Sequence, residues 1–526
     1  MDNKLLKDKE KTEKDSKNKL YTESSEHNIS NNDFDEKINK SSNLEVSNVC
    51  KLSLRSLREK FIAKEISPLA VHAELLKRQK QYEHLNSYIT VCEDKNSVLQ
   101  NSWQRIVSGE ARTLEGIPIG VKDLFCTNGI KTTSGSTILK NFVPYYESTV
   151  TQRLWNLGAY CFGKENMDEF AMGSSCRTSA FGPVKNPINE KCVPGGSSGG
   201  SAANVANYMS YVSIGSDTGG SVRQPAAFCG VVGVKPTYGR CSRYGIISYA
   251  SSFDQAGVIA RSVDDACIVL DEIMGFDNKD MTSLKDENQI TLKNLSAVVK
   301  GKKIGFIKEH LDWQNEHVKK MWIDCMNELE RQGATLIPIS IPSEKYFLSI
   351  YYILTTSEAF SNLAKFDGVR FGERVMNDDF ELMYKHSRAV LGDEVKRRIL
   401  SGAFCLASER FDAYYMYALN LRKKAQSEMQ EIFEHVDAIL SPTSPNEAFE
   451  LDYYEDDPTV MYRQDIFTVT ANVCGLPGIS VPAGFGENKL PLGMHVMTAA
   501  YDEKTMIEVA KSIEKWATDI MQNTKL

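Results

Sequence analysis

Two glycine-rich turns, each presenting serine, are the segments of this sequence best suited to nucleophilic chemistry. The first spans residues 195–201 (GGSSGGS) and the second residues 217–221 (DTGGS), so that Ser197 and Ser221 stand 24 residues apart. Glycine lets the backbone approach a ligand closely and adopts the positive φ that tight turns need. Consecutive N–H groups in such turns can converge on a developing oxyanion. One such turn is usually only a surface turn, but the pair indicates a site for acyl transfer through serine.

The base that deprotonates a serine here must be something other than a neighbouring histidine, because none of the eight histidines falls between Leu85 and Glu309. Lys122 is the alternative. It follows the apolar run 116–121, which predicts a buried strand, and α/β proteins place functional groups at strand ends. A lysine is a base only when neutral, so burial must lower its pKa from about 10.4. A lysine after a strand is more often a solvated charge, and both interpretations stay open from its position alone.

One serine mechanism that these residues allow is that of the α/β-hydrolases. Residues 195–199 match G-x-S-x-G, the nucleophile elbow, which requires a strand just before the serine and a histidine further along the chain. Residues 190–194 (EKCVP) make a poor strand, although His435 and His495 are available. The elbow is therefore the weaker interpretation.

The second mechanism uses Lys122, Ser197 and Ser221. The lysine would accept a proton through Ser197, and Ser221 would attack the substrate carbonyl. The oxyanion would be held by a run of backbone N–H groups, those of Thr218, Gly219, Gly220 and Ser221. A scaffold without activity is a third possibility, and the presence of all three side chains counts against it.

Hydrophobic periodicity predicts an α/β protein without internal repeats. A short helical prelude covers 52–81, with Ser67-Pro68 as a helix start. Further strands are expected at 87–91, 159–163, 211–215, 438–440 and 478–482, and helices at 101–109, 149–158, 408–436 and 503–516. Residues 303–341 read as a βαβ unit with parallel strands. One large domain fits this alternation best.

Composition limits the class of protein. The 526 residues are 42% hydrophobic and 25% charged, as in soluble globular proteins, and no uncharged apolar stretch is long enough for a membrane span. A net charge of -7 argues against a broad nucleic-acid-binding face. The 12 cysteines lack zinc-site spacing, so we expect no metal site and reduced thiols in a cytoplasmic compartment. Residues 1–48 are polar and charged, which predicts a disordered extension.

The segment from Gly116 to Gly257 resembles the amidase signature family, on the motifs GIPIGVKD, PGGSSGGSAA and GSDTGGSVRQPA. Members of that family use a Ser–cis-Ser–Lys triad, which the resemblance assigns to Lys122, Ser197 as the bridging serine and Ser221 as the nucleophile. The spacings of 75 and 24 residues agree with the family. The resemblance implies a single large α/β domain over 49–526, with a mixed β-sheet core covered by helices on both faces and a catalytic core at about 116–260.

Three further stretches, at 357–372, 392–404 and 461–482, resemble the branch of the family that releases ammonia from glutamine for a tRNA-dependent amidotransferase. The resemblance implies that Arg398 and Asp465 hold glutamine, and that a tyrosine of the Tyr351-Tyr352 pair lines the same site, for which we choose Tyr351. Free glutamine carries a carboxylate and an ammonium, so a binding site needs one partner of each sign. Either residue alone is more often a surface charge, and a tyrosine more often packs in the core.

The same resemblance implies partners. A B subunit would activate Glu-tRNA(Gln) with ATP and Mg²⁺ and use the ammonia, a small C subunit would brace the pair, and this chain would need no cofactor of its own and touch no membrane. The alternative is a stand-alone amidase acting on small or acyl amides. The chain departs from the branch at Cys176-Arg177, where a glutamate is expected, and this change could alter a substrate or interface contact.

Overall fold

A mixed β-sheet of eleven strands carries the predicted site. The computed structural model describes residues 46–285, 291–312, 315–453 and 461–523, and residues 49–526 group as one unit. The strands are β1 (Tyr88–Val91), β2 (Pro118–Lys122), β3 (Tyr160–Glu165), β4 (Val212–Ser216), β5 (Val232–Lys235), β6 (Ala256–Ala260), β7 (Lys303–Ile307), β8 (Thr335–Ile339), β9 (Ala438–Pro442), β10 (Gly478–Phe485) and β11 (Pro491–Met497).

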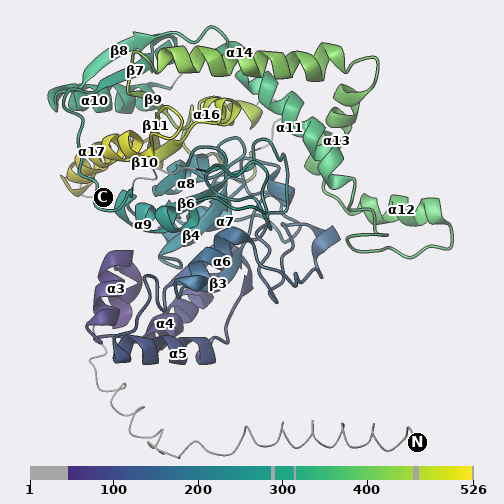
Figure 1. Cartoon of the computed structure of the whole chain (residues 1–526), viewed down its shortest axis with the longest axis horizontal. Helices are drawn as coiled ribbons and strands as arrows, with labels where there is room; N and C mark the ends of the chain where they lie inside the picture. Colours follow the sequence, from purple (N-terminus) through teal and green to yellow (C-terminus); the bar gives the residue numbers. More distant parts are fainter. Residues whose placement is uncertain (1–45, 286–290, 313–314, 454–460, 524–526) are drawn as a thin grey trace, which may run out of the picture. The chain divides into compact units, whose positions relative to one another are not determined.

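The order of strands across the sheet is β1-β3-β2-β4-β6-β5-β10-β11-β9-β7-β8. β2 pairs in parallel with both β3 and β4, whereas the pairs from β4 through β6, β5, β10 and β11 to β9 are antiparallel. β7 pairs in parallel with β8 and β9, which confirms the predicted βαβ unit, seen at the upper left of Figure 1. β2 therefore lies in the interior of the sheet, and Lys122 at its end has no route to solvent along an edge.

Helices pack against the sheet and beside it. They are α3 (Leu54–Ile62), α4 (Pro68–Gln81), α5 (Asn96–Ser108), α6 (Thr149–Asn156), α7 (Gly199–Ala206), α8 (Arg223–Cys229), α9 (Val263–Ile273), α10 (Glu316–Arg331), α11 (Phe347–Leu363), α12 (Phe380–Ala389), α13 (Asp393–Leu406), α14 (Tyr417–Ile432), α16 (Val469–Cys474) and α17 (Glu503–Asn523).

Both faces of the sheet are covered, as the alternation along β6 shows. Ile259 packs in a cluster with Ala202 of α7 and Ala226 of α8, while its neighbour Val258 belongs to the main core that includes Leu270 of α9. Successive residues of a strand point to opposite faces, so α7 and α8 lie on one face and α9 on the other. The predicted α/β fold with a mixed sheet is confirmed.

The structure also corrects boundaries. The prelude forms two helices, and Ser67 caps α4 by accepting a hydrogen bond from the N–H of Ala70, as expected. The helix predicted from 101 begins at Asn96. The long helical stretch predicted over 408–436 is present over 412–432, where a π-helical turn at Asp412–Met416 leads directly into α14, but its predicted start and end are wrong.

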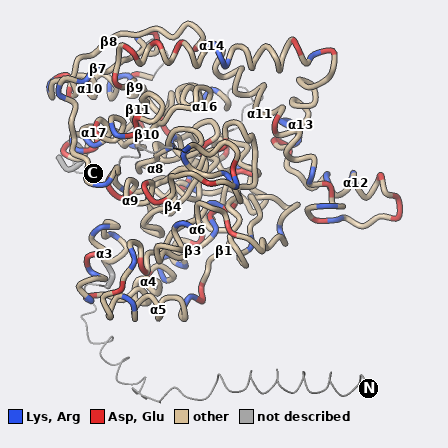
Figure 2. Tube along the Cα trace, viewed as in Figure 1, with Lys and Arg blue, Asp and Glu red and all other residues tan. Residues whose placement is uncertain are grey.

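Charges of both signs lie side by side on helices such as α10, α13 and α14, whereas strands such as β4 and β6 carry none (Figure 2). Such a distribution differs from the basic stripe of a protein that grips nucleic acid. Within the described ranges, no helix combines the length and apolarity that a bilayer span requires. The predicted disorder of residues 1–48 falls almost wholly outside the described residues, and all twelve cysteines fall within them as unpaired thiols.

Candidate active site

Lys122 is held at the carboxyl end of β2 with none of its surface exposed. Its Nζ lies 2.7 Å from Ser197 Oγ and 2.8 Å from Ser216 Oγ. The position follows from the pairing of β2 with β4, which brings the end of β4, where Ser216 lies, beside the end of β2. The predicted contact between the lysine and the bridging serine is therefore present in the structure.

Burial lowers the pKa of Lys122 to about 7, although Cys176, Asp168 and Asp217 act in the opposite direction. Removal from water disfavours the charged ammonium, and the nearby carboxylates do not compensate fully. A substantial fraction of the amine is thus neutral near pH 7. The condition that sequence reasoning set for a lysine base is met.

Ser197 lies in a turn held by backbone contacts on both sides. The Gly196–Ser197 peptide is cis, the N–H of Gly196 donates to Gln224 Oε1 at 3.0 Å, and the N–H of Asp168 donates to the carbonyl of Ser197 at 3.3 Å. The N–H of Ser198 donates to the carbonyl of Ser221 at 3.2 Å, which ties the two glycine-rich turns together.

The turn can sit this close to the sheet because it leads into a helix of small residues. A side chain at Gly200 of α7 would collide with the backbone carbonyl oxygens of Asn166 and Ser87. Glycine is therefore required by close approach of the backbone at this position.

Ser221 is the most accessible of the three residues, with 8% of its surface exposed against none for Lys122 and Ser197. Among the described residues its hydroxyl has no hydrogen-bond partner, and it makes no hydrogen bond to Ser197 Oγ. Catalytic hydrogen bonds are often long without substrate and tighten in the substrate complex. The Lys122–Ser197 half of the predicted relay is formed, and the Ser197–Ser221 half stays a prediction.

Asp217 shapes the second glycine-rich turn, residues 217–221, which is called the oxyanion turn below. Its carboxylate accepts the N–H of Gly220 at 3.0 Å and the N–H of Val222 at 3.2 Å. The Gly220 N–H is thus already engaged, which narrows the predicted donor set. The N–H groups of Thr218, Gly219 and Ser221 have no acceptor among the described residues, so they are the available donors.

Arg223 fixes the Asp217 carboxylate by donating hydrogen bonds to it from Nε and from a terminal nitrogen, each at 2.9 Å. Burial opposes ionisation of Asp217, but the guanidinium beside it holds the pKa of this carboxyl well below its ordinary value. The pair is fully buried and a side-chain oxygen of Asn472 accepts from Arg223 at 2.7 Å. A paired and hydrogen-bonded buried charge of this kind keeps the turn in one conformation.

Arg398 and Asp465 lie close together around Tyr352. The Arg398 guanidinium carbon is 5.4 Å from the centre of the Tyr352 ring, and the Tyr352 hydroxyl donates to Asp465 Oδ2 at 3.4 Å. Both residues are buried, 4% and 6% exposed. Burial raises the pKa of Asp465 to about 7, while the Ser174 hydroxyl and Arg398 act against this rise. A carboxyl held so far from water favours a cationic ligand that restores its ionisation.

Hydrogen bonds connect this charged pair to the serine turn. Ser174 donates from its hydroxyl to Asp465 at 2.8 Å, and its carbonyl accepts from Gln224 Nε2 at 3.1 Å. Gln224 also accepts from the N–H of Gly196, as described above. The predicted glutamine-binding residues and the predicted bridging serine therefore belong to one connected region.

Tyr351 lies against the oxyanion turn, since a Cβ built on Gly219 would come 2.5 Å from its hydroxyl oxygen. Its ring also packs edge-on against Phe253 at 5.8 Å. Only glycine at 219 leaves room for this tyrosine. Tyr352, the other tyrosine of the predicted pair, is the residue in contact with both Arg398 and Asp465.

The unusual Cys176-Arg177 pair splits between the site and the surface. Cys176 is fully buried and donates its N–H to Asp168 Oδ2 at 2.8 Å, near Lys122. Arg177 instead donates to the carbonyls of Leu451 and Tyr453 at 3.1 and 2.6 Å. Arg177 therefore anchors the 451–453 segment rather than contacting the triad.

The nucleophile-elbow interpretation is wrong. Residues 190–194 contain only an isolated bridge between Cys192 and Glu450 and no strand. His495 is buried with its Nε2 against Arg223 at 2.9 Å, and Lys122 occupies the position beside Ser197. Sequence reasoning missed Ser216, Gln224 and Tyr249, and the polar Arg223-Gln224 pair directly after the second turn was the available signal.

Sequence comparison places the chain in a known family of enzymes. The amidase family profile matches residues 70–507, and the chain belongs to this family. It is 46% identical over 495 residues to the A subunit of the glutamyl-tRNA(Gln) amidotransferase of Ehrlichia ruminantium (strain Gardel), covering 90% of this chain and 99% of that protein. It is 45% identical over 476 residues to the protein of the same name from Xanthobacter autotrophicus, covering 89% and 96%.

Solved structures agree. The crystal structure of the A subunit of glutamyl-tRNA(Gln) amidotransferase from Thermotoga maritima superposes with a TM-score of 0.72 at 37% identity, over 89% of this chain and 94% of that one. The native peptide amidase of Stenotrophomonas maltophilia superposes with a TM-score of 0.76 at 26% identity, over 89% and 97%.

Proposed function

We propose that this chain hydrolyses glutamine to glutamate and ammonia, as the glutaminase component of a tRNA-dependent amidotransferase. The observation that carries the proposal is the buried Lys122 amine at 2.7 Å from Ser197, in one hydrogen-bonded region with the buried pair Arg398 and Asp465. The relatives named as the A subunit of glutamyl-tRNA(Gln) amidotransferase support the substrate.

The reaction proceeds by acyl transfer. Neutral Lys122 takes a proton from Ser197, which takes one from Ser221, and the Ser221 oxygen forms a bond to the side-chain amide carbon of glutamine. The N–H groups of Thr218, Gly219 and Ser221 hold the resulting oxyanion. The relay returns a proton to the amide nitrogen, the carbon–nitrogen bond breaks and ammonia leaves. Water then attacks the acyl-enzyme, and glutamate is released with Ser221 restored.

The charged pair selects glutamine over uncharged amides. Arg398 pairs with the α-carboxylate of the substrate and Asp465 with its α-ammonium, so that each group meets a charge of opposite sign. Tyr351, beside Gly219, forms the wall between this pair and the oxyanion turn. Arg398 already pairs with Glu394 at 2.8 Å, so the substrate carboxylate would be a second anionic partner, and an amide without charges gains neither contact.

The ammonia passes to partner subunits. The B subunit uses ATP and Mg²⁺ to activate Glu-tRNA(Gln) and accepts the ammonia, and the C subunit braces the complex. ATP and Mg²⁺ act on the partner, and this chain contributes only the glutaminase site. We assign the complex to the cytoplasm, where the twelve unpaired cysteines remain reduced.

The test is ammonia release from glutamine by the purified chain with and without the B and C subunits, beside a simple primary amide. Hydrolysis of glutamine that strengthens with the subunits supports the proposal. Activity on simple amides alone, with no associated partner, would instead identify a stand-alone amidase.

Arg398→Gln should raise KM for glutamine and lower kcat/KM about 10- to 100-fold, because a hydrogen bond to a charged group contributes roughly 1.5–3 kcal/mol. Hydrolysis of a simple amide should be unchanged. Arg397→Gln is the matched control, since Arg397 also pairs with Glu394 but its side chain is 46% exposed. Equal losses in the two variants, measured by steady-state ammonia release, would contradict the role of Arg398.

A further inference from the structure

Asp254 is a buried carboxylate at which two parts of the candidate site meet. It closes the loop 248–254, directly before β6, and is 3% exposed. Every group that hydrogen-bonds to it among the described residues is a donor: the hydroxyls of Ser248 and Thr218 and the N–H groups of Tyr249 and Ala250, at 2.7 to 3.2 Å. The carboxylate of Asp254 therefore acts purely as an acceptor, for the loop and for a residue outside it, while the Asp254 N–H donates to the carbonyl of Ala250 at 2.8 Å.

The residue outside the loop is Thr218 of the oxyanion turn. Its hydroxyl donates to Asp254 Oδ1 at 2.8 Å, and its own N–H is among the donors without an acceptor in the described chain. Asp217 fixes the following part of the turn through Gly220 and Val222. Asp254 thus holds the beginning of the turn, and Asp217 holds its end.

On its other side, Asp254 holds Tyr249. The Tyr249 N–H donates to Asp254 Oδ2 at 3.0 Å, and the Tyr249 hydroxyl accepts from Arg398 at 2.9 Å. The guanidinium carbon of Arg398 also lies 5.4 Å from the centre of the Tyr249 ring. Arg398 is also held by Glu394, to which its Nε donates at 2.8 Å, so the loop that Asp254 organises supplies one of its two hydrogen-bonding supports.

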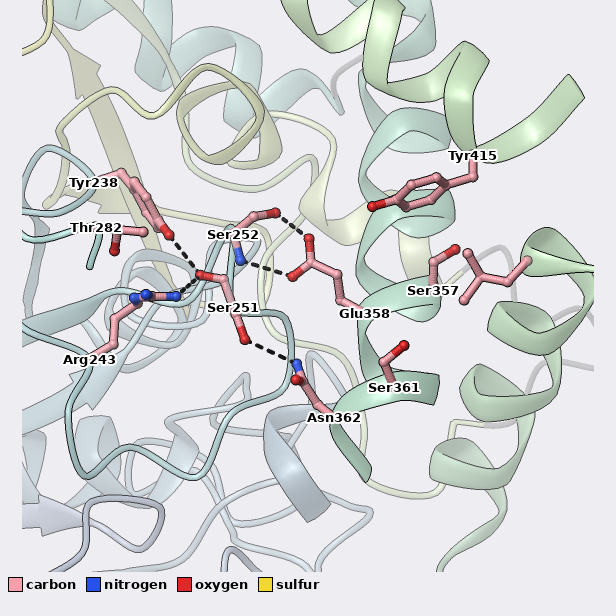
Figure 3. Close-up of a pocket in the computed structure, with 11 residues that line it drawn as sticks. Tyr238, Arg243, Ser251, Ser252, Thr282, Ser357, Glu358, Ser361, Asn362 and Tyr415 are labelled. Atoms are coloured by element: carbon pink, nitrogen blue, oxygen red, sulfur yellow. Dashed lines mark hydrogen bonds between the residues drawn. The ribbon is translucent and has the colours of Figure 1, made fainter. Parts of the chain in front are cut away.

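Helix α11 fastens the outer side of this loop. Ser252 donates its N–H to Glu358 at 2.9 Å, and Asn362 donates to the carbonyl of Tyr249 at 3.1 Å and to the hydroxyl of Ser251 at 3.2 Å. Figure 3 shows these side chains on the wall of a pocket of about 450 Å³. The loop is thus held by α11 on one side and by Asp254 on the other. These contacts keep the groups that meet Thr218 and Arg398 in one position.

We infer that Asp254 is a positioning residue that sets the oxyanion turn, through Thr218, and the glutamine-binding Arg398, through Tyr249, in register with one another. The effect of Asp254 on Arg398 rests on the proposed function, because it concerns the binding of glutamine. Its effect on Thr218 rests on the amidase reaction alone. Asparagine in place of Asp254 would turn an NH₂ group toward groups that are themselves donors. We therefore expect both Thr218 and Tyr249 to move. A displacement of about 1 Å at a reacting centre costs about 100-fold in rate.

The test compares kcat and KM for glutamine and for propionamide, a primary amide without charges. Asp254→Asn should lower kcat about 100-fold on both amides and raise KM for glutamine. Tyr249→Phe, which loses the acceptor for Arg398 and a hydrogen bond of 2.9 Å to the Thr355 hydroxyl, should raise KM for glutamine about tenfold and leave propionamide unchanged. Thr218→Val should lower kcat on both amides, and Thr218→Ser, which keeps the hydroxyl, should restore it.

Asp265→Asn is the matched control, because Asp265 is 1% exposed and accepts the N–H of Leu54 at 3.1 Å, and none of its hydrogen bonds among the described residues reaches the loop 248–254, Thr218 or Arg398. It should lower Tm without changing kcat or KM. If Asp254→Asn and Thr218→Val also change only Tm, the inference is overturned. If wild type does not hydrolyse glutamine, the proposed function fails, while the propionamide arm still decides the role of Asp254 toward Thr218.

Discussion

Replacing Ser221 with alanine should reduce ammonia release to background, a loss of at least about 10⁴-fold in kcat, while the protein stays folded. Removal of the nucleophile from a serine site costs this much because the remaining groups cannot form the acyl-enzyme. Ser221 is 8% exposed and its hydroxyl has no partner among the described residues, so the truncation breaks no structural hydrogen bond of the hydroxyl. Burst-phase mass spectrometry with a slow amide substrate checks the intermediate directly, as an acyl adduct on Ser221.

Ser201→Ala is the control for this variant. Ser201 lies in the first turn of α7, after Ser197, is fully buried, and its hydroxyl lies against Glu165 rather than against Lys122 or Ser221. It should retain activity within about twofold. An acyl adduct elsewhere, or an active Ser221→Ala variant with unchanged folding, would remove Ser221 from the role of nucleophile.

Replacing Lys122 should have the second-largest effect. Both Lys122→Met and Lys122→Arg should lose about 10³-fold or more in kcat, since methionine has no basic group and arginine cannot give up its proton in a protein. The arginine variant is the more informative, because it keeps the positive charge. A purely electrostatic role for the lysine would let arginine support activity.

The chain offers a matched control in Lys235. It is buried, its pKa is also lowered by burial to about 7, and its Nζ donates to the carbonyl of Pro236 at 3.0 Å rather than to a serine. Lys235→Met should change stability more than kcat. Comparable losses of kcat in Lys122→Met and Lys235→Met would show that burial of a lysine, rather than its contact with Ser197, accounts for the effect.

The residues of the triad could be predicted because each stands at a feature that short-range sequence defines. Lys122 ends an apolar strand, and Ser197 and Ser221 lie in glycine-rich turns whose backbone needs are visible in the sequence. Ser216 could not be predicted in the same way. It contacts Lys122 only because β2 and β4 are neighbours in the sheet, and strand order is a long-range property.

The pair proposed to bind glutamine shows a different limit of prediction from sequence. Arg398 and Asp465 are 67 residues apart in the sequence and come from α13 and a short 3₁₀ turn, and only the resemblance singled them out. Their neighbours Tyr249 and Tyr352 carried no local signal, because a tyrosine in a core and one beside a ligand look alike in sequence. The unpredicted π-helical turn at Asp412–Met416 has a similar cause, since hydrophobic spacing does not separate a π-helical turn from an α-helix.

The most direct test of the account is the dependence of kcat/KM on pH between about 5.5 and about 8.5, measured with propionamide. Propionamide is used because burial also raises the pKa of Asp465 to about 7, and its ionisation would affect the binding of glutamine in the same range. Lys122 must be neutral to accept a proton, and burial lowers its pKa to about 7. The ammonium form predominates below this pKa and the active amine above it, so the rate should rise about tenfold per pH unit at low pH and level off above about 7. A profile that is flat over this range, or that still climbs toward the ordinary lysine pKa of about 10.4, would contradict a buried neutral lysine as the base.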